Sequence, residues 1–411
     1  MIPVGLAGGG GSGQTSCHGP IGPSDAVPAG WSDRMETTSL APHDGELMGF
    51  LAQGLAAGAS DLHLVAGYAP TLRIHGRLQA LAGDPLAGGQ IARMIDSVMP
   101  AVLKPQMELR KDLDFSLSFS QGGEPARFRV NVFHNQGSLG ACFRFIPPTI
   151  PSFEWMGIPV DLARRIASLP GGLVLITGVT GAGKTTTLAG LVQMVSQSGN
   201  RRIVTIEEPI EYIFKAAAKS VISQREVGID VDSFAEGLKY SLRQDPDVIL
   251  CGEIRDRETA QMAISAAETG HLVLTTLHTQ DARGAITRLV DIFPVDQHQD
   301  VRSQLSLSLR FVISQHLLPN IKPEEKRVLA LEILVANDAV RAAIRMNKIE
   351  TIDSLIQTGK KVGMQSLDEN LSYLACTRRI AARTAHRFAK NPAGLRAMGV
   401  ADVELEDGVS I

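Results

Sequence analysis

One stretch decides the fold of this chain: Gly171-Gly-Leu-Val-Leu-Ile-Thr-Gly-Val-Thr-Gly-Ala-Gly-Lys-Thr-Thr186. It contains the pattern G-x-x-x-x-G-K-T between Gly178 and Thr185. The apolar run from Leu173 to Ile176 before it has the composition of a buried parallel strand. After it, apolar residues recur at i, i+3, i+4 and i+7, the spacing of one helical face: Leu188, Leu191, Val192 and Val195. A strand, a glycine loop and a helix in this order are the context that a phosphate-binding loop requires.

The residue types in this loop suit a nucleoside triphosphate. Glycines allow the backbone to curl, so that successive N–H groups face the phosphates at the positive end of the helix. Lys184 is expected to reach the β and γ phosphates, and the Thr185 hydroxyl to bind Mg²⁺. A glycine-rich turn that binds nothing is the alternative, and the flanking strand and helix count against it. The predicted nucleotide-binding residues of the loop are Gly178, Val179, Thr180, Gly181, Ala182, Gly183, Lys184, Thr185 and Thr186.

Composition narrows the possible classes of protein. A chain of 411 residues is long enough for two or three domains. Its net charge of −3 and aromatic content of 5% give no indication of a nucleic-acid partner. The four cysteines lie far apart, which argues against a zinc knuckle or a disulfide framework and favours a reducing cytoplasm. No apolar run approaches the roughly 18–20 residues that would span a bilayer.

The chain divides into five segments. Residues 1–44 are rich in glycine and proline, and we expect a disordered tail without the features of a secretory signal. A globular domain follows at 45–146, and a proline-rich linker at 147–160. Residues 161–335 contain the phosphate loop, and residues 336–411 have the periodicity of a terminal helical subdomain.

Four short apolar runs predict the sheet of the nucleotide-binding domain. They alternate with helical patterns, which indicates an α/β fold with a largely parallel sheet and covering helices. The runs are Leu173–Thr177, Arg202–Ile206, Val248–Cys251 and Leu272–Leu277.

A hairpin with arginines on one face is predicted in the preceding domain, from Ala126–Phe133 and Gly140–Ile146. Apolar residues in both strands alternate with polar ones, among them Arg129 and Arg144. A half-buried sheet with a solvated basic face is the alternative to a functional role for these arginines.

Acidic residues and histidines follow the predicted strands. Glu253 ends an apolar strand, the position of an acid that holds Mg²⁺ or a water. Glu207 ends another strand, where a carboxylate can orient the attacking water. His271 and His278 flank one strand; without further ligands nearby in sequence, hydrogen bonding to the nucleotide or between subunits is expected rather than a metal site.

In this order the motifs resemble the type II/IV secretion ATPase superfamily, and within it the type IV pilus retraction (twitching motility, PilT-like) ATPases. The resembling stretches run from about residue 47 to 375: Gly58–His63, Ala126–Asn131, Thr205–Glu211, Gln224–Val227, Asp245–Ile249, Gly252–Asp256, Ala267–Leu272, Leu277–Thr279, Asp338–Arg341 and Gly363–Leu367. The resemblance implies a RecA-like P-loop core, a smaller N-terminal α+β (PAS-like) domain and a C-terminal helical subdomain. It also implies a cytoplasmic hexamer that hydrolyses ATP with Mg²⁺ and acts at the inner membrane on a platform protein of the pilus machine.

Roles for individual residues also follow from the resemblance. Glu207 matches the acidic-box glutamate that polarises the hydrolytic water, and Glu253 the Walker B glutamate near Mg²⁺. His271 and His278 match the histidine-box pair. Arg129 and Arg144 match arginines presented to the γ-phosphate. The predicted catalytic residues are therefore Glu207, Glu253, Arg129, Arg144 and His278; His271 is predicted to bind nucleotide, and Thr185 and Glu253 to bind Mg²⁺.

Two departures and three alternatives accompany this prediction. The hairpin loop reads His134-Asn-Gln-Gly137 where relatives often carry an arginine, and Glu208 stands where aspartate is usual. Extension-type relatives usually carry a tetracysteine insertion; the stretch Leu317–Glu332 is short and lacks cysteine, which favours retraction. The alternatives are an extension or secretion ATPase of the same superfamily, a RecA-type nucleic-acid translocase, and a nucleotide-dependent regulator without motor function.

Overall fold

The computed structural model describes residues 44–401 except residues 75, 122–123, 218 and 323. The expected disordered tail therefore lies outside the described residues, apart from Asp44. The Asp44 side chain accepts hydrogen bonds from the N–H groups of Glu46 and Leu47 and so caps the first helix.

The N-terminal domain is an antiparallel sheet with helices packed against it. Its six strands are ordered β3-β2-β1-β6-β5-β4. The strands are β1 (Asp61–Leu64), β2 (Thr71–Ile74), β3 (Arg77–Ala80), β4 (Asp112–Gln121), β5 (Glu124–Asn135) and β6 (Ser138–Ile146). The helices are α1 (Gly45–Ala56), α2 (Gly88–Val98) and α3 (Lys104–Leu109). The sheet and helices together match the α+β architecture expected for this segment.

The predicted hairpin is formed by β5 and β6, with Arg129 opposite Arg144 in the register. Phe128, Val130 and Phe143 are fully buried on the apolar face of this hairpin. Strict alternation in a strand places the intervening arginines on the opposite face.

The core that contains the phosphate loop is a seven-stranded sheet ordered β13-β12-β7-β11-β10-β8-β9, parallel except for the β12–β13 pair. Its strands are β7 (Gly172–Thr177), β8 (Arg202–Glu207), β9 (Val221–Glu226), β10 (Val248–Cys251), β11 (Leu272–Leu277), β12 (Leu309–Leu318) and β13 (Val328–Val335). The four predicted strands are confirmed, and β9, β12 and β13 are additional to them. The short segment between β12 and β13 joins two antiparallel strands.

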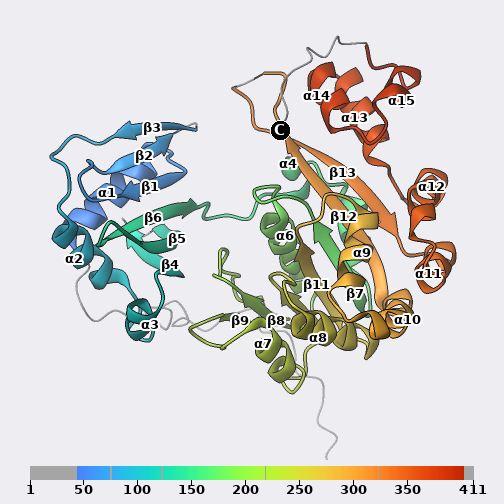
Figure 1. The fold of residues 1–411 in the computed structure, drawn as a ribbon, viewed down its shortest axis with the longest axis horizontal. Coiled ribbons are helices and arrows are strands. Elements are labelled where there is room, and N and C mark those ends of the chain that lie inside the picture. Colours follow the sequence, from blue (N-terminus) through green and yellow to red (C-terminus); the bar gives the residue numbers. More distant parts are fainter. Residues whose placement is uncertain (1–43, 75, 122–123, 218, 323, 402–411) are drawn as a thin grey trace, which may run out of the picture. The chain divides into compact units, whose positions relative to one another are not determined.

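Helices cover both faces of this sheet (Figure 1). One face packs on α4 (Phe153–Met156), α5 (Val160–Ala167) and α6 (Lys184–Ser198). The other packs on α7 (Phe234–Ser241), α8 (Arg257–Glu268), α9 (Ala282–Asp291) and α10 (His298–Ser308). Since α4 falls within residues 147–160, the segment expected to be a linker contains a helix, and its Phe153 packs into the core. The largely parallel α/β sheet expected from the sequence is confirmed.

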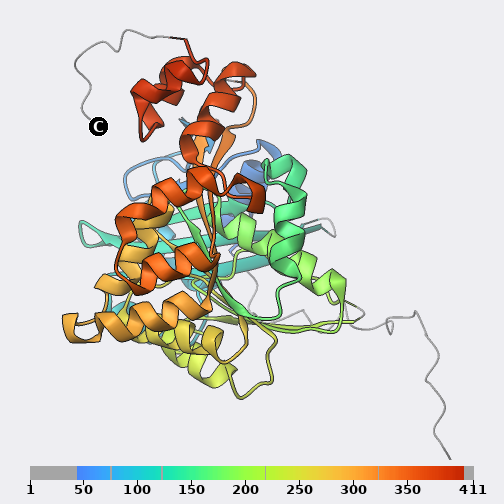
Figure 2. The same ribbon diagram turned by 90° about the vertical axis from the view of Figure 1, so that its right-hand side faces the viewer.

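The chain ends in short helices, as the periodicity after residue 336 predicts (Figure 2). They are α11 (Asp338–Arg345), α12 (Ile352–Thr358), α13 (Leu367–Cys376), α14 (Ala382–Phe388) and α15 (Pro392–Ala397). Single 3-10 turns lie at Val295–Gln297, Ile349–Thr351 and Lys360–Val362. α13 to α15 share an apolar cluster with Leu318, Val328 and Ala330 of the β12–β13 pair. Across the described part of the chain, no helix combines the length and the apolar character needed to cross a membrane.

Candidate functional site

The phosphate-binding loop lies between β7 and α6, at the carboxyl edge of the parallel sheet. Gly183 has a φ of 88° and is the N-cap of α6, a left-handed conformation that favours glycine. Gly178 has a φ of 143°, and a Cβ there would lie 2.5 Å from the carbonyl oxygen of Gln315. A side chain at Gly178 would therefore clash with the neighbouring backbone. The glycine loop forms a cradle at the helix N-terminus that fits a phosphate group.

Lys184 points back into this cradle. Its Nζ donates hydrogen bonds to the carbonyl oxygens of Gly178 (2.8 Å) and Val179 (3.2 Å), and lies 3.5 Å from Nδ1 of His278. Burial lowers the pKa of Lys184, and the charge of Glu253 opposes that shift. A buried ammonium beside a glycine loop suits the β and γ phosphates of a nucleotide. The Val179 side chain is exposed, so its contribution is its carbonyl group.

Glu253 follows β10 and faces the phosphate loop across the cavity. Its carboxylate is 2.8 Å from Nε2 of His278 and forms an ion pair with Arg255. Burial raises the pKa of Glu253, but the hydrogen bonds from Arg255 and His278 outweigh it, and the net shift is downward. Glu253 is therefore ionised at neutral pH, and its oxygens and the Thr185 hydroxyl are of the ligand type that Mg²⁺ prefers.

Glu207 is the last residue of β8 and is almost fully buried. Burial raises its pKa to about 7, although Thr205 Oγ1 at 2.7 Å and Gln224 Nε2 at 3.3 Å both donate hydrogen bonds to it. A carboxylate that titrates near neutral pH is well suited to accept a proton from water. The Thr205–Glu207 spacing in one strand explains the first of these hydrogen bonds, because residues i and i+2 share a face.

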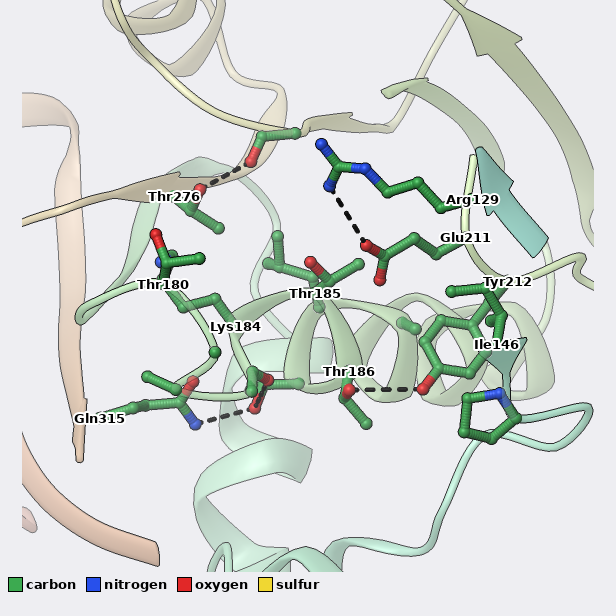
Figure 3. Close-up of a pocket in the computed structure, with 18 of the residues that line it drawn as sticks. Arg129, Ile146, Thr180, Lys184, Thr185, Thr186, Glu211, Tyr212, Thr276 and Gln315 are labelled. Atoms are coloured by element: carbon green, nitrogen blue, oxygen red, sulfur yellow. Dashed lines mark hydrogen bonds and ion pairs between the residues drawn. The ribbon is translucent and has the colours of Figure 1, made fainter. Parts of the chain in front are cut away.

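The two hairpin arginines line the same cavity as Glu207, Glu253 and Lys184. This cavity has a volume of about 850 Å³. Arg129 and Glu211 point toward one another in Figure 3, with 3.9 Å between Nη1 and Oε1. Arg144 is paired with Asp61, with 2.9 Å between Nε and Oδ1. Both guanidinium groups are therefore balanced by carboxylates of the cavity wall.

His271 is not brought into this cavity. It directly precedes β11, whereas the phosphate loop and His278 lie at the carboxyl end of the sheet. Its Nδ1 is 3.0 Å from the carbonyl oxygen of Ala266. His278 lines the cavity and His271 does not. A contact between subunits therefore remains the alternative role for His271.

Among the other lining residues, three make contacts that the sequence did not predict. Glu211 faces Arg129, the Tyr212 hydroxyl lies 3.3 Å from Thr186 Oγ1, and Gln315 Nε2 donates to Thr187 Oγ1 at 2.8 Å (Figure 3). Glu211 and Tyr212 follow Glu207 closely enough for the sequence to have indicated them. Gln315 is distant in sequence and enters the site through the β7–β12 pairing.

Comparisons with known proteins identify the family of this chain. Residues 37–383 match the family described as type II/IV secretion system protein. The chain is 42% identical to the type IV pilus retraction ATPase PilT of Pseudomonas aeruginosa, over 84% of this chain and 98% of that protein. It is 42% identical to a twitching motility protein of Neisseria gonorrhoeae, over 80% of this chain and 86% of that protein. This chain belongs to the type II/IV secretion ATPase family.

A solved structure of the same family is similar throughout its length. It is the crystal structure of the pilus retraction motor PilT with bound ADP, with a TM-score of 0.77 and 40% identity, covering 85% of this chain and 98% of that one. Membership of the secretion ATPase family makes this protein an ATPase.

Proposed function

We propose that this protein is a cytoplasmic, homohexameric motor ATPase that couples ATP hydrolysis to type IV pilus retraction. The observation that carries the proposal is one cavity lined by a phosphate loop, two acids at strand ends and two arginines from another domain. The 42% identity to retraction and twitching motility proteins over most of the chain supports the retraction class.

The chain's own residues divide the work of hydrolysis. The glycine loop and Lys184 hold the phosphates, and Thr185 and Glu253 hold Mg²⁺. Bound Mg²⁺ supplies positive charge that stabilises the transferring phosphoryl group. Glu207 accepts a proton from the attacking water, and His278 orients the Glu253 carboxylate through the 2.8 Å contact.

Arg129 and Arg144 connect this chemistry to movement. An arginine that reaches the transferring phosphoryl group accelerates related reactions by about 10³–10⁵. To do so, Arg129 must exchange its present partners Asp114 and Glu211 for the nucleotide, and Arg144 must exchange Asp61. Hydrolysis then depends on how the N-terminal domain is held against the core, and repeated domain closure around a hexamer performs work on the platform protein at the inner membrane.

The test is a strain that lacks the gene, complemented with the parent protein or with Glu253→Gln. We expect excess pili and no twitching in the deletion strain, and rescue by the parent alone. Loss of pili would identify an extension ATPase, and normal pili with impaired export would identify a secretion ATPase. Purified Glu253→Gln protein should bind ATP without turning it over. Turnover that increases with DNA and falls steeply with salt would favour a nucleic-acid translocase.

A further inference from the structure

The peptide group of Ile210 is held from two sides by charged side chains. The Ile210 N–H donates to Oε2 of Glu226 at 3.1 Å, and its carbonyl oxygen accepts from Nε of Arg127 at 2.8 Å. Ile210 lies between Glu207 and Glu211, which line the cavity together with Glu208. Whatever fixes Ile210 therefore limits the positions of both acids.

The two side chains come from different domains. Glu226 ends β9 of the core and is paired in register with Glu207 on β8, and the Val227 N–H donates to the Glu207 carbonyl at 2.9 Å. Arg127 is on β5 of the N-terminal domain, two residues before Arg129. The segment that carries the proposed water-activating acid is thus attached to its own sheet by Glu226 and to the other domain by Arg127.

Two serines of β4 complete the network. The Ser116 hydroxyl donates to Glu226 Oε2 at 2.6 Å and accepts from Arg127 Nη2 at 2.8 Å. The Ser116 N–H donates to Glu226 Oε1 at 3.1 Å, and Ser118 Oγ accepts from Arg127 Nη1 at 2.6 Å. All three guanidinium nitrogens of Arg127 are therefore engaged, with an orientation that a lysine could not reproduce.

The ion pair between Arg127 and Glu226, at the centre of this network, is buried. The side chains of Arg127 and Glu226 are 15% and 5% exposed, and Nη2 of one lies 3.7 Å from Oε2 of the other. A buried ion pair adds little net stability, because desolvation offsets the attraction, but it fixes geometry. Neither Arg127 nor Glu226 lines the cavity, whereas Arg129 and Arg144 do.

We propose that the Arg127–Glu226 pair is a positioning device that holds the Glu207–Glu211 segment in its catalytic geometry only while the N-terminal domain is docked on the core. This inference rests on the proposed function, in which Glu207 activates the water. Arg127 acts through the Ile210 peptide and not on the nucleotide. Domain movement then affects the rate of hydrolysis in two ways: through Arg129 and Arg144 at the cavity, and through the contact of Arg127 with the Ile210 peptide.

The test is ATP turnover by the full-length Arg127→Met protein. We expect kcat to fall by about 10- to 100-fold, because small misplacements of catalytic groups cost factors of this size. The KM for ATP should stay within about twofold, since Arg127 is away from the cavity. Amide hydrogen exchange of residues 207–214 should accelerate. Arg77→Met is the matched control, an arginine on strand β3 of the same domain, where every residue is exposed, and it should change none of these quantities.

The pH profile distinguishes positioning from a loss of folded protein. The charged side chains that act on Glu207 are Glu211, which raises its pKa, and Arg127, which lowers it; Thr205 and Gln224 also lower it through hydrogen bonds. Removing Arg127 should therefore move the acidic limb of kcat/KM to higher pH. A variant that was merely less folded would lose amplitude and keep the same limb.

Two further variants make the outcome decisive. Arg127→Lys keeps the charge and loses the three-nitrogen contact, so we expect a smaller fall in kcat with the limb close to its parent position. It also replaces Arg127→Met if that protein does not fold. A kcat within twofold of the parent in a folded Arg127 variant would overturn the proposal. Undiminished turnover by Glu207→Gln would instead remove the role of Glu207 itself, which is a failure of the proposed function.

Discussion

At the scale of single residues, we expect Glu207 to set the pH dependence of ATP turnover. Burial raises the pKa of Glu207 to about 7. The carboxylate must be unprotonated to accept a proton from water, so kcat/KM for ATP should rise with pH and reach half its maximum near pH 7. A pH–rate profile measured at saturating Mg²⁺ checks this.

Thr205→Val is the matched variant for this pH dependence. The Thr205 hydroxyl donates to Glu207 at 2.7 Å and favours its charged form. Removing the hydroxyl raises the pKa of Glu207, so the limb should move to higher pH. A limb that stays in place in Thr205→Val would mean that the titrating group is not Glu207.

At the scale of elements, the β7–α6 connection depends on glycine at Gly178 more than at Gly181. Both residues have positive φ, but a Cβ at Gly178 would also lie 2.5 Å from the Gln315 carbonyl oxygen, whereas a Cβ at Gly181 would have no atom of the described residues within 4 Å outside its two chain neighbours. We expect Gly178→Ala to abolish ATP binding. Gly181→Ala should lower the free energy of unfolding by only about 1 kcal/mol. Nucleotide titration and chemical denaturation of both variants test this; equal effects would contradict it.

A second element-scale prediction concerns the attachment of the C-terminal helices. Lys390 Nζ lies 2.7 Å from Glu332, 2.9 Å from Asp353 and 3.4 Å from Asp281. Although burial lowers the pKa of Lys390, the three carboxylates raise it more strongly. Lys390 therefore carries its charge at all ordinary pH values and joins α9, β13 and α12 to the segment after α14.

Lys390→Met should leave these carboxylates without a cation and reduce the free energy of unfolding by about 2–4 kcal/mol. Urea denaturation measures the loss, and Lys361→Met, at an exposed position of the same subdomain, should be neutral. Adding Glu332→Gln to Lys390→Met should recover part of the stability, because one buried charge is then removed. A double variant less stable than Lys390→Met alone would contradict the pairing.

At the scale of the whole molecule, the proposed hexamer predicts that inactive subunits impair their neighbours. Increasing fractions of Glu253→Gln subunits, allowed to exchange with parent subunits, should reduce turnover more steeply than dilution alone. The physical reason is that domain movement in one subunit has to be accommodated by the next around a closed ring. Linear loss of turnover with the inactive fraction would indicate independent subunits. Lys361→Met subunits in place of Glu253→Gln are the control.

Much of the fold followed from local sequence pattern. The expected boundaries of β10, Val248–Cys251, and β11, Leu272–Leu277, agree with the structure. Strand β9 was not expected, because Val221–Glu226 has mixed polarity and forms the edge of the sheet, where burial is incomplete. The sequence therefore gives its last residue, Glu226, no role beyond its place in the resembling stretch Gln224–Val227.

The sequence by itself determined the phosphate loop, the acids at the ends of β8 and β10 and the alternation that separates arginines from the hairpin core. These features depend on contacts within a few residues, so their spacing encodes them. Only the tertiary structure decided which carboxylate each arginine faces, and that Ile210 is held by Glu226 and Arg127. Those contacts join residues from separate parts of the chain, and their energies depend on burial and distance, which no local pattern specifies.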